Sequence, residues 1–246
     1  MNLRFPGIAF MACALVLCVA GCKDPPGLPM PGSETPRPDQ VLDFATLYRQ
    51  NCAACHGDRG TNGTAISLEN PVYLETAGLA NIQRATASGV PGTMMPGFAK
   101  SAGGMLTDRQ IAAVTQGMIA AWGKPAELSG QVLPAYAGGS PGVAAEGEKA
   151  FATFCARCHG TDGTGVFTQS VRTGSIVEPS YLSLVSDQGL RSFIAAGQPE
   201  QGMPDWRSDL TGSAARAMTN QEITDVVAWI AAHRTTTPGQ PYQQRP

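Results

Sequence analysis

Two cysteines separated by two residues and followed at once by a histidine occur twice in this sequence. The residues are Cys52, Cys55 and His56 in the first copy and Cys155, Cys158 and His159 in the second. This spacing is the attachment signature of a c-type haem. The two thiols bind the haem vinyl groups as thioethers, and the adjacent imidazole then lies under the iron as its proximal ligand. The chain is therefore predicted to hold two covalently bound haems.

A redox-active dithiol and half of a zinc site are the other two interpretations of this spacing. A redox dithiol has no use for a histidine directly after the second cysteine. A structural zinc ion needs four ligands, and neither half of the sequence has a third or fourth ligand to spare. Haem attachment is the interpretation that uses all three residues.

The elements that position these motifs are repeated. A length of 246 residues with an internal repeat indicates two small domains, which we expect at 39–123 (the first half) and 143–234 (the second half). Pro-rich or polar segments surround them: a stalk at 22–38, a linker at 124–142 and a tail at 235–246. The porphyrin would supply much of the core of each short domain.

The N-terminus resembles a bacterial lipoprotein signal. Arg4 precedes an apolar run from Ile8 to Ala20, and small residues lead directly to Cys22. We expect residues 1–21 to be removed and Cys22 to be lipidated, which would anchor the chain on the periplasmic side of a bacterial membrane. The alternatives are an ordinary cleaved signal and an uncleaved membrane helix, for which the run is short.

The remaining cysteines and the net charge narrow the function. Of seven cysteines, four lie in the two motifs and three in the N-terminal segment, so none remains for a structural disulfide. Haem is attached outside the cytoplasm, which favours an extracytoplasmic protein despite that absence. Removal of residues 1–21 leaves 16 basic and 19 acidic side chains, a formal charge of −3. Nucleic acid is therefore excluded as a partner, and a basic or mixed protein surface is favoured.

Helices are predicted on either side of each motif. Asp39 is the expected N-cap of a helix that runs into the first motif, and a helix from Ala144 runs into the second. Capping-box patterns at Thr107 and Thr219 begin an amphipathic helix that closes each half. Glycine-rich loops at 57–63 and 160–165 follow the two histidines.

The register between the halves selects one methionine in each. The motifs match at an offset of 103 residues, and Pro71 onwards matches Pro179 onwards at an offset of 108, so the second loop after the histidine has five extra residues. This register aligns Met95, rather than Met94, with Met203. Both precede a proline, which keeps the methionine out of a helix and on a loop. We expect Met95 and Met203 to be the distal iron ligands, although a lone methionine more often fills a core gap.

These features together resemble the class I cytochrome c fold: a helix leading into Cys-x-x-Cys-His-Gly, a haem-side loop, Met-Pro on a second loop and a closing amphipathic helix. The likeness extends to cytochrome c subunits of haem-copper oxidases and of other respiratory complexes. It implies an all-α protein of tandem domains, with thioether bonds at the four motif cysteines, His56 and His159 as proximal ligands and Met95 and Met203 as distal ligands. One departure concerns the first helix. The family commonly has glycine four residues before its aromatic residue; Gly147 before Phe151 fits, whereas Phe44 before Tyr48 does not, which predicts a wider or shifted helix crossing in the first half.

Two functions are open. Irons with histidine and methionine ligands are saturated, which favours an electron carrier in a respiratory chain, with redox proteins or a respiratory membrane complex as partners and no small-molecule substrate. A dihaem enzyme of the peroxidase or thiosulfate dehydrogenase type needs an open or unusual distal position. The only histidine outside the motifs is His233. It is expected at the C-terminal end of the last helix, where the helix dipole favours a positively charged side chain, so a role as an unusual distal ligand is not needed to explain it.

Overall fold

The computed structural model describes residues 32, 35–168 and 172–236. Both halves lie in one compact unit, which begins at Asp39. The predicted signal peptide, Cys22, most of the stalk and most of the tail lie outside the described residues. Within the described ranges, no helix combines the length and apolar character needed to cross a membrane.

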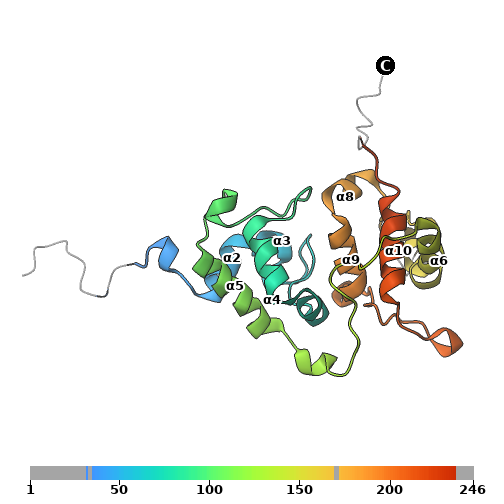
Figure 1. The fold of residues 1–246 in the computed structure, drawn as a ribbon, viewed down its shortest axis with the longest axis horizontal. Coiled ribbons are helices and arrows are strands. Elements are labelled where there is room, and N and C mark those ends of the chain that lie inside the picture. Colours follow the sequence, from blue (N-terminus) through green and yellow to red (C-terminus); the bar gives the residue numbers. More distant parts are fainter. Residues whose placement is uncertain (1–31, 33–34, 169–171, 237–246) are drawn as a thin grey trace, which may run out of the picture. The chain divides into compact units, whose positions relative to one another are not determined.

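The first half is built from three α-helices longer than one turn and the short helix of the motif (Figure 1). The elements are η1 (Pro38–Gln40), α2 (Phe44–Asn51), α3 (Ala53–His56), α4 (Pro71–Ser88), η2 (Lys100–Ala102) and α5 (Asp108–Trp122). Both α2 and α4 pack against α5. The prediction that Asp39 caps the first helix was wrong. The helix begins at Phe44, because the carboxylate of Asp43 accepts the N–H of Thr46 over 2.8 Å and residues 38–40 form a separate 3₁₀ turn.

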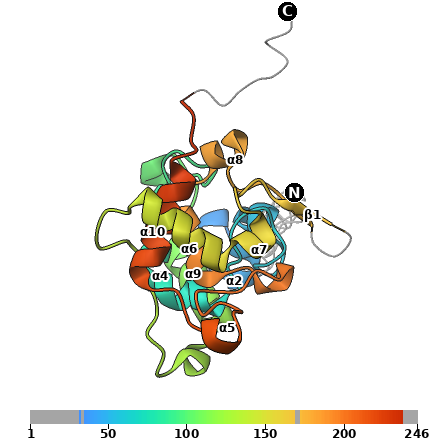
Figure 2. The same ribbon diagram turned by 90° about the vertical axis from the view of Figure 1, so that its right-hand side faces the viewer.

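The second half repeats this order with an added hairpin. After η3 (Pro125–Leu128), its elements are α6 (Ala144–Phe154), α7 (Ala156–His159), β1 (Val166–Phe167), β2 (Arg172–Thr173), α8 (Pro179–Leu184), α9 (Asp187–Ala196), η4 (Pro199–Gln201), η5 (Gly212–Ala214) and α10 (Asn220–Ala231). The predicted all-α class is confirmed, and the two short antiparallel strands lie where the five extra residues were expected. Figure 2 shows β1 after α7, and α6 beside α10, against which it packs.

One long helix in the first half corresponds to two helices in the second. Inside α4 the helical geometry is interrupted at Gly78, which has φ +67°. At the offset of 108, the counterpart of Gly78 is Ser186, which lies between α8 and α9 and caps α9 by accepting the N–H of Gly189. The same bend is therefore made by a left-handed glycine in one half and by a new helix start in the other.

The capping boxes at both closing helices are confirmed. The side chain of Thr107 accepts the N–H of Gln110 at the start of α5, and that of Thr219 accepts the N–H of Glu222 at the start of α10. Each closing helix then presents its apolar face to a buried cluster of its own half.

The crossing of the first and last helices uses glycine from opposite partners in the two halves. In the second half, a Cβ atom on Gly147 of α6 would lie 1.9 Å from the carbonyl oxygen of Asp225 in α10, so only glycine fits. In the first half the glycine is Gly117 of α5, and the ring of Phe44 packs against it. The small residue that the first helix lacks is thus supplied by the last one.

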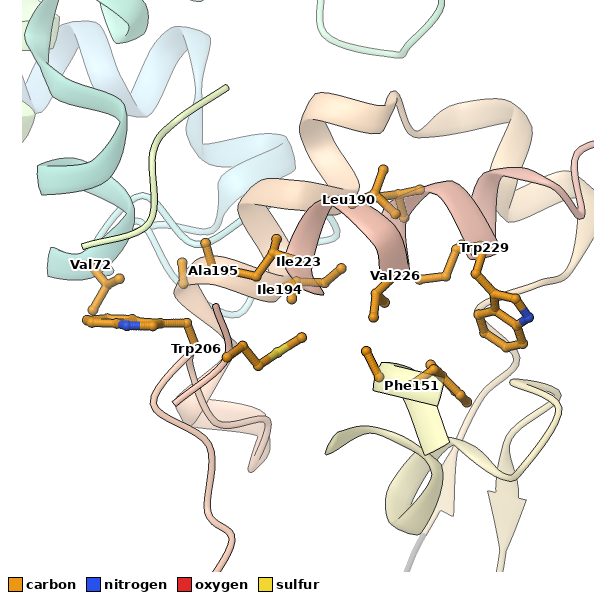
Figure 3. Close-up of a cluster of buried hydrophobic side chains, with 14 of the residues drawn as sticks. Val72, Phe151, Leu190, Ile194, Ala195, Trp206, Ile223, Val226 and Trp229 are labelled. Atoms are coloured by element: carbon orange, nitrogen blue, oxygen red, sulfur yellow. The ribbon is translucent and has the colours of Figure 1, made fainter. Parts of the chain in front are cut away.

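Aromatic rings complete both crossings. Trp122 makes edge contacts with Phe44 and Tyr48 at centroid distances of 5.3 and 5.0 Å. In the second half Trp229 lies over Phe151 with centroids 4.2 Å apart, at one end of the buried cluster shown in Figure 3. Tyr48, Phe151 and Trp229 are buried in the core cluster of their own half, and Phe44 and Trp122 pack against that of the first half.

Candidate haem sites

Each Cys-x-x-Cys-His motif forms the same turn directly after the preceding helix. Cys52 ends α2 with φ −117° and ψ −35°, and Cys155 ends α6 with φ −119° and ψ −34°. In both turns the backbone N–H of the histidine donates to the carbonyl oxygen of the first cysteine over 3.0 Å. The two cysteines and the histidine of one motif therefore share a single helical turn, which is the arrangement that attachment of one haem requires.

The electrostatics of the cysteines do not suit a redox dithiol. Burial raises the pKa of the Cys52 thiol to about 12, and burial likewise raises the pKa of Cys155 to about 12. Thiol–disulfide exchange needs an accessible thiolate of low pKa, which neither first cysteine provides. All four motif cysteines are free of disulfides.

His56 is held in the form that binds a metal. Its side chain is buried, and loss of hydration lowers the pKa of the imidazole, so the neutral ring is favoured. The ring Nδ1 lies 2.7 Å from the carbonyl oxygen of Ile66. Because a carbonyl can only accept, the proton is on Nδ1 and the lone pair of Nε2 is left for the iron.

His159 is neutral for the same reason but is held differently. Burial lowers the pKa of its imidazole as well. Its Nδ1 is a buried polar atom without a hydrogen-bond partner. The two proximal positions thus share the motif turn and differ at the second ring nitrogen.

The Met-Pro loops have the same backbone arrangement in both halves. The N–H of Val90 donates to the carbonyl of Met95 over 3.0 Å, and the N–H of Gln198 donates to the carbonyl of Met203 over 2.9 Å. These two bonds are related by the predicted offset of 108 residues. The side chains of Met95 and Met203 are partly buried, whereas that of Met94 is 75% exposed.

A glycine at the end of the preceding helix allows each Met-Pro loop to pack closely. Gly89 after α4 and Gly197 after α9 have φ angles of +72° and +66°. A Cβ atom on Gly89 would lie 2.7 Å from the carbonyl oxygen of Met95, and one on Gly197 would lie 2.6 Å from that of Pro204. The backbone next to each methionine is therefore fixed against the helix end.

The residues present fit a covalently bound haem on their own chemistry. Each half combines two unpaired thiols on the motif turn, a neutral imidazole and a methionine thioether on a packed loop. A zinc site finds no such support, because no three side chains of histidine, cysteine, aspartate or glutamate gather in the part of the chain that the structure describes. His233 lies just after α10, where its Nδ1 is 2.9 Å from the carbonyl oxygen of Trp229 and its ring packs against that indole.

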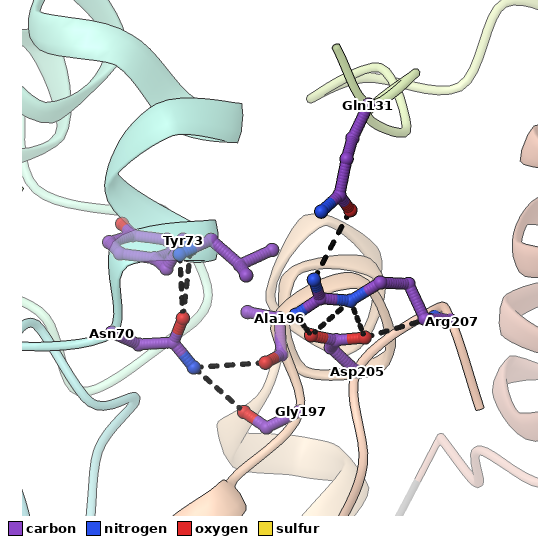
Figure 4. A network of polar contacts seen from close by, with 8 residues as sticks. Asn70, Tyr73, Gln131, Ala196, Gly197, Asp205 and Arg207 are labelled. Atoms are coloured by element: carbon purple, nitrogen blue, oxygen red, sulfur yellow. Dashed lines mark hydrogen bonds and ion pairs between the residues drawn. The ribbon is translucent and has the colours of Figure 1, made fainter. Parts of the chain in front are cut away.

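Contacts that the sequence did not predict join the two halves beside these sites. Asn70 caps α4 through its side-chain oxygen, and its amide nitrogen donates to the carbonyl of Ala196 over 2.9 Å (Figure 4). Val72 of α4 is buried in the cluster of the second half, where Figure 3 shows it beside Trp206. An N-cap could be predicted from the Asn-Pro sequence, but its second hydrogen bond could not.

A buried arginine fixes the linker to the second half. Arg191 of α9 is only 4% exposed, and its guanidinium donates to the carbonyls of Ala135 and Tyr136 in the linker and to the hydroxyl of Thr224 in α10. The guanidinium also donates to the side-chain oxygen of Asn220. In the sequence, Arg191 stands out as a charged residue on the apolar side of an otherwise amphipathic helix. That position indicates that its side chain is buried with a polar partner, but it does not say which partner.

Comparisons with known proteins agree with this geometry. The family model described as "Cytochrome c" matches residues 144–234, and the model "Cytochrome C oxidase, cbb3-type, subunit III" matches residues 39–116. The two matches together cover more than half of the chain, which belongs to the cytochrome c families with one domain in each half. Domains of this kind hold covalently bound c-type haems, so the chain carries two.

Curated proteins similar to this chain include oxidase subunits. The cbb3-type cytochrome c oxidase subunit FixPc of Rhizobium leguminosarum bv. viciae is 26% identical over 189 residues, which cover 73% of this chain and 58% of the relative. The subunit CcoP of Azospirillum sp. (strain B510) is 29% identical over 154 residues, which cover 56% of this chain and 47% of the relative. The chain thus spans about half of these relatives' length.

A solved structure also matches. A chain of the reducing HAO-like protein complex Kustc0457/Kustc0458 of Kuenenia stuttgartiensis has 16% sequence identity and a TM-score of 0.45, over 82% of this chain and 100% of that chain.

Proposed function

We propose that this protein is a membrane-anchored dihaem electron carrier of an extracytoplasmic respiratory chain, acting as a subunit or partner of a larger respiratory complex. The observation that carries the proposal is the repeated pairing of a motif turn with a Met-Pro loop whose backbone hydrogen bonds are the same in both halves. The similar proteins are named as subunits of cbb3-type cytochrome c oxidases, which supports a respiratory oxidase as the larger complex.

Within each half, the chain's residues bind and enclose the haem. Cys52 and Cys55 would hold one haem through thioether bonds, and His56 and Met95 would be the two iron ligands. The second half uses the equivalent residues, which are Cys155, Cys158, His159 and Met203. Bound haem supplies one-electron exchange at its iron. If histidine and methionine both bound each iron, neither site would offer room for peroxide or another substrate, which favours a carrier over a dihaem enzyme.

The distal ligands provide the test of this function. Oxidised protein should show the weak near-infrared band of sulfur-ligated haem with the amplitude of two sites. Met95→Ala and Met203→Ala should each remove about half of it, and Met94→Ala, the matched control, should leave it unchanged. Rapid binding of carbon monoxide by one haem of the wild-type protein would support a dihaem enzyme instead. A pyridine haemochrome assay should first give two haems per chain.

The proposed anchor is a lipid on Cys22, and the proposed location is the periplasmic side of a bacterial membrane. The motivation is the run of small residues before that cysteine. Mass spectrometry of the mature protein should find an acylated terminus at Cys22, and Cys22→Ser should release the protein into the soluble periplasmic fraction. An unmodified terminus further along the chain would contradict the anchor without affecting the haem sites.

A further inference from the structure

The proximal histidines differ at the ring nitrogen that does not face the iron. The Nδ1 of His56 donates to the carbonyl of Ile66 over 2.7 Å. The Nδ1 of His159 is also buried, although the residue as a whole is only partly buried, and it has no hydrogen-bond partner. The backbone angles of the two motif turns agree within a few degrees, so the turns do not cause this difference.

The two loops after the histidines differ, which accounts for the different surroundings of the two ring nitrogens. Both loops end in the same way: the hydroxyl of Ser67 donates to the carbonyl of Gly60 over 3.0 Å, and that of Ser175 donates to the carbonyl of Gly163 over 3.4 Å. Between these points the second loop has its five extra residues. In the described part of that loop β1 pairs with β2, and β2 ends at Thr173, directly before Gly174, which aligns with Ile66.

The effect on an iron follows from the donor strength of the imidazole. When Nδ1–H donates to a carbonyl oxygen, the ring gains electron density and Nε2 becomes a stronger base. A stronger donor stabilises the ferric state over the ferrous state and so lowers the reduction potential. An imidazole whose Nδ1–H has no acceptor is the weaker donor.

We propose that the carbonyl of Ile66 distinguishes the two sites, so that the haem of the first half has the lower reduction potential and that of the second half the higher. Ile66 acts through His56 and is therefore a positioning residue. The inference rests on the proposed function insofar as His56 and His159 are the proximal ligands. It orders the reduction potentials of two haem sites that have the same proposed ligands.

Reciprocal loop exchanges test the proposal in the full-length dihaem protein. In the first variant, residues 164–174 are replaced by the sequence of residues 61–66, which removes the five extra residues. In the second, residues 61–66 are replaced by the sequence of 164–174. Redox titration should show the higher potential falling in the first variant and the lower potential rising in the second. Unchanged potentials, or shifts in the opposite directions, would overturn the proposal.

Nitrogen-15 NMR of the reduced wild-type protein tests it without altering a loop. The Nδ1 proton of His56 should be shifted far downfield and exchange slowly with solvent, and that of His159 should not. His233→Gln removes the one other histidine signal and serves as the assignment control. If both proximal histidines show protected Nδ1 protons, the proposal fails. A haem count below two per chain would instead contradict the proposed function.

Discussion

The helix crossings of the two halves solve one packing problem with opposite residues. In the second half Gly147 of the first helix faces Trp229 of the last, and in the first half Phe44 of the first helix faces Gly117 of the last. The pairs occupy matching positions, because 103 residues separate the first helices and 112 separate the capped starts of the last ones. Both halves therefore pack a large residue against a glycine at this position. The glycine lies in the first helix of the second half and in the last helix of the first half. The combined volume at the crossing, rather than a glycine in one helix, is what the fold requires.

The largest effect should come from filling the glycine at the tighter crossing. Gly147→Ala places Cβ 1.9 Å from a backbone oxygen of α10, which cannot move without shifting the helix. We expect the second half to lose on the order of 3 kcal/mol of unfolding free energy. The matched variant Gly117→Ala meets side-chain atoms of the partly buried Phe44, down to its Cβ, rather than backbone, so Phe44 must shift at the start of α2 and a smaller loss of about 2 kcal/mol is expected there. Denaturant unfolding followed by Soret circular dichroism should separate the two, and equal losses would refute the distinction.

The next effect concerns the linker, which contacts the second half through Arg191. Arg191→Met keeps much of the side-chain volume but leaves the carbonyls of Ala135 and Tyr136 without their donor. We expect a loss of about 2–3 kcal/mol in the second half and faster proteolytic cleavage of the linker. Gln83→Met, at the matching position of α4, is the control and should change stability by no more than about 0.5 kcal/mol. Similar effects of the two variants would show that the linker is not held by this arginine.

A smaller effect should separate the two roles of Asn70. Asn70→Ala removes both the cap of α4 and the donor to Ala196, with an expected cost of about 2 kcal/mol. Asn70→Ser keeps a capping oxygen without a charge and loses the donor to Ala196, so about half of that cost should remain. The unfolding transitions of the two halves should also become less coupled in both variants. Glu178→Ala removes the exposed cap at the matching position of the second half and should leave the coupling intact.

The smallest effect depends on pH and on one difference between the capping boxes. Glu222 in α10 has its pKa lowered from 4.5 to about 2, chiefly by its hydrogen bonds with Arg216, whereas the first half has Gln110 at this position. The carboxylate stabilises the folded state above pH 4.5, and that contribution is lost as pH falls toward 2. Both groups are partly exposed, so only about 0.5 kcal/mol is expected. Glu222→Gln should remove this pH dependence from the second half; if the two halves already respond alike to acid, the ion pair is not its cause.

Most of the fold could be predicted because its signals are local. The two motifs, the capping threonines and the proline after each methionine act on their own neighbours in the chain, and the all-α class follows from them. The start of the first helix was misplaced at Asp39 because both Asp39 and Asp43 precede an apolar residue that could begin the helix. The hydrogen bond from the N–H of Thr46 to Asp43 decides between them. The predicted roles of the cysteines, histidines, methionines and Cys22 remain predictions.

The amino-acid sequence by itself determined that the chain has two halves, where each Cys-x-x-Cys-His motif lies and which methionine matches which, because covalent chemistry and repeat register depend on spacing alone. The tertiary structure decided the partners of groups that the sequence does not distinguish. It placed the carbonyl of Ile66 at His56 and left Nδ1 of His159 without an acceptor. It also paired Phe44 with Gly117 and buried Arg191 against the linker. Every residue has a backbone carbonyl, and any helix can supply a small side chain, so only the folded path of the chain determines which of them meet.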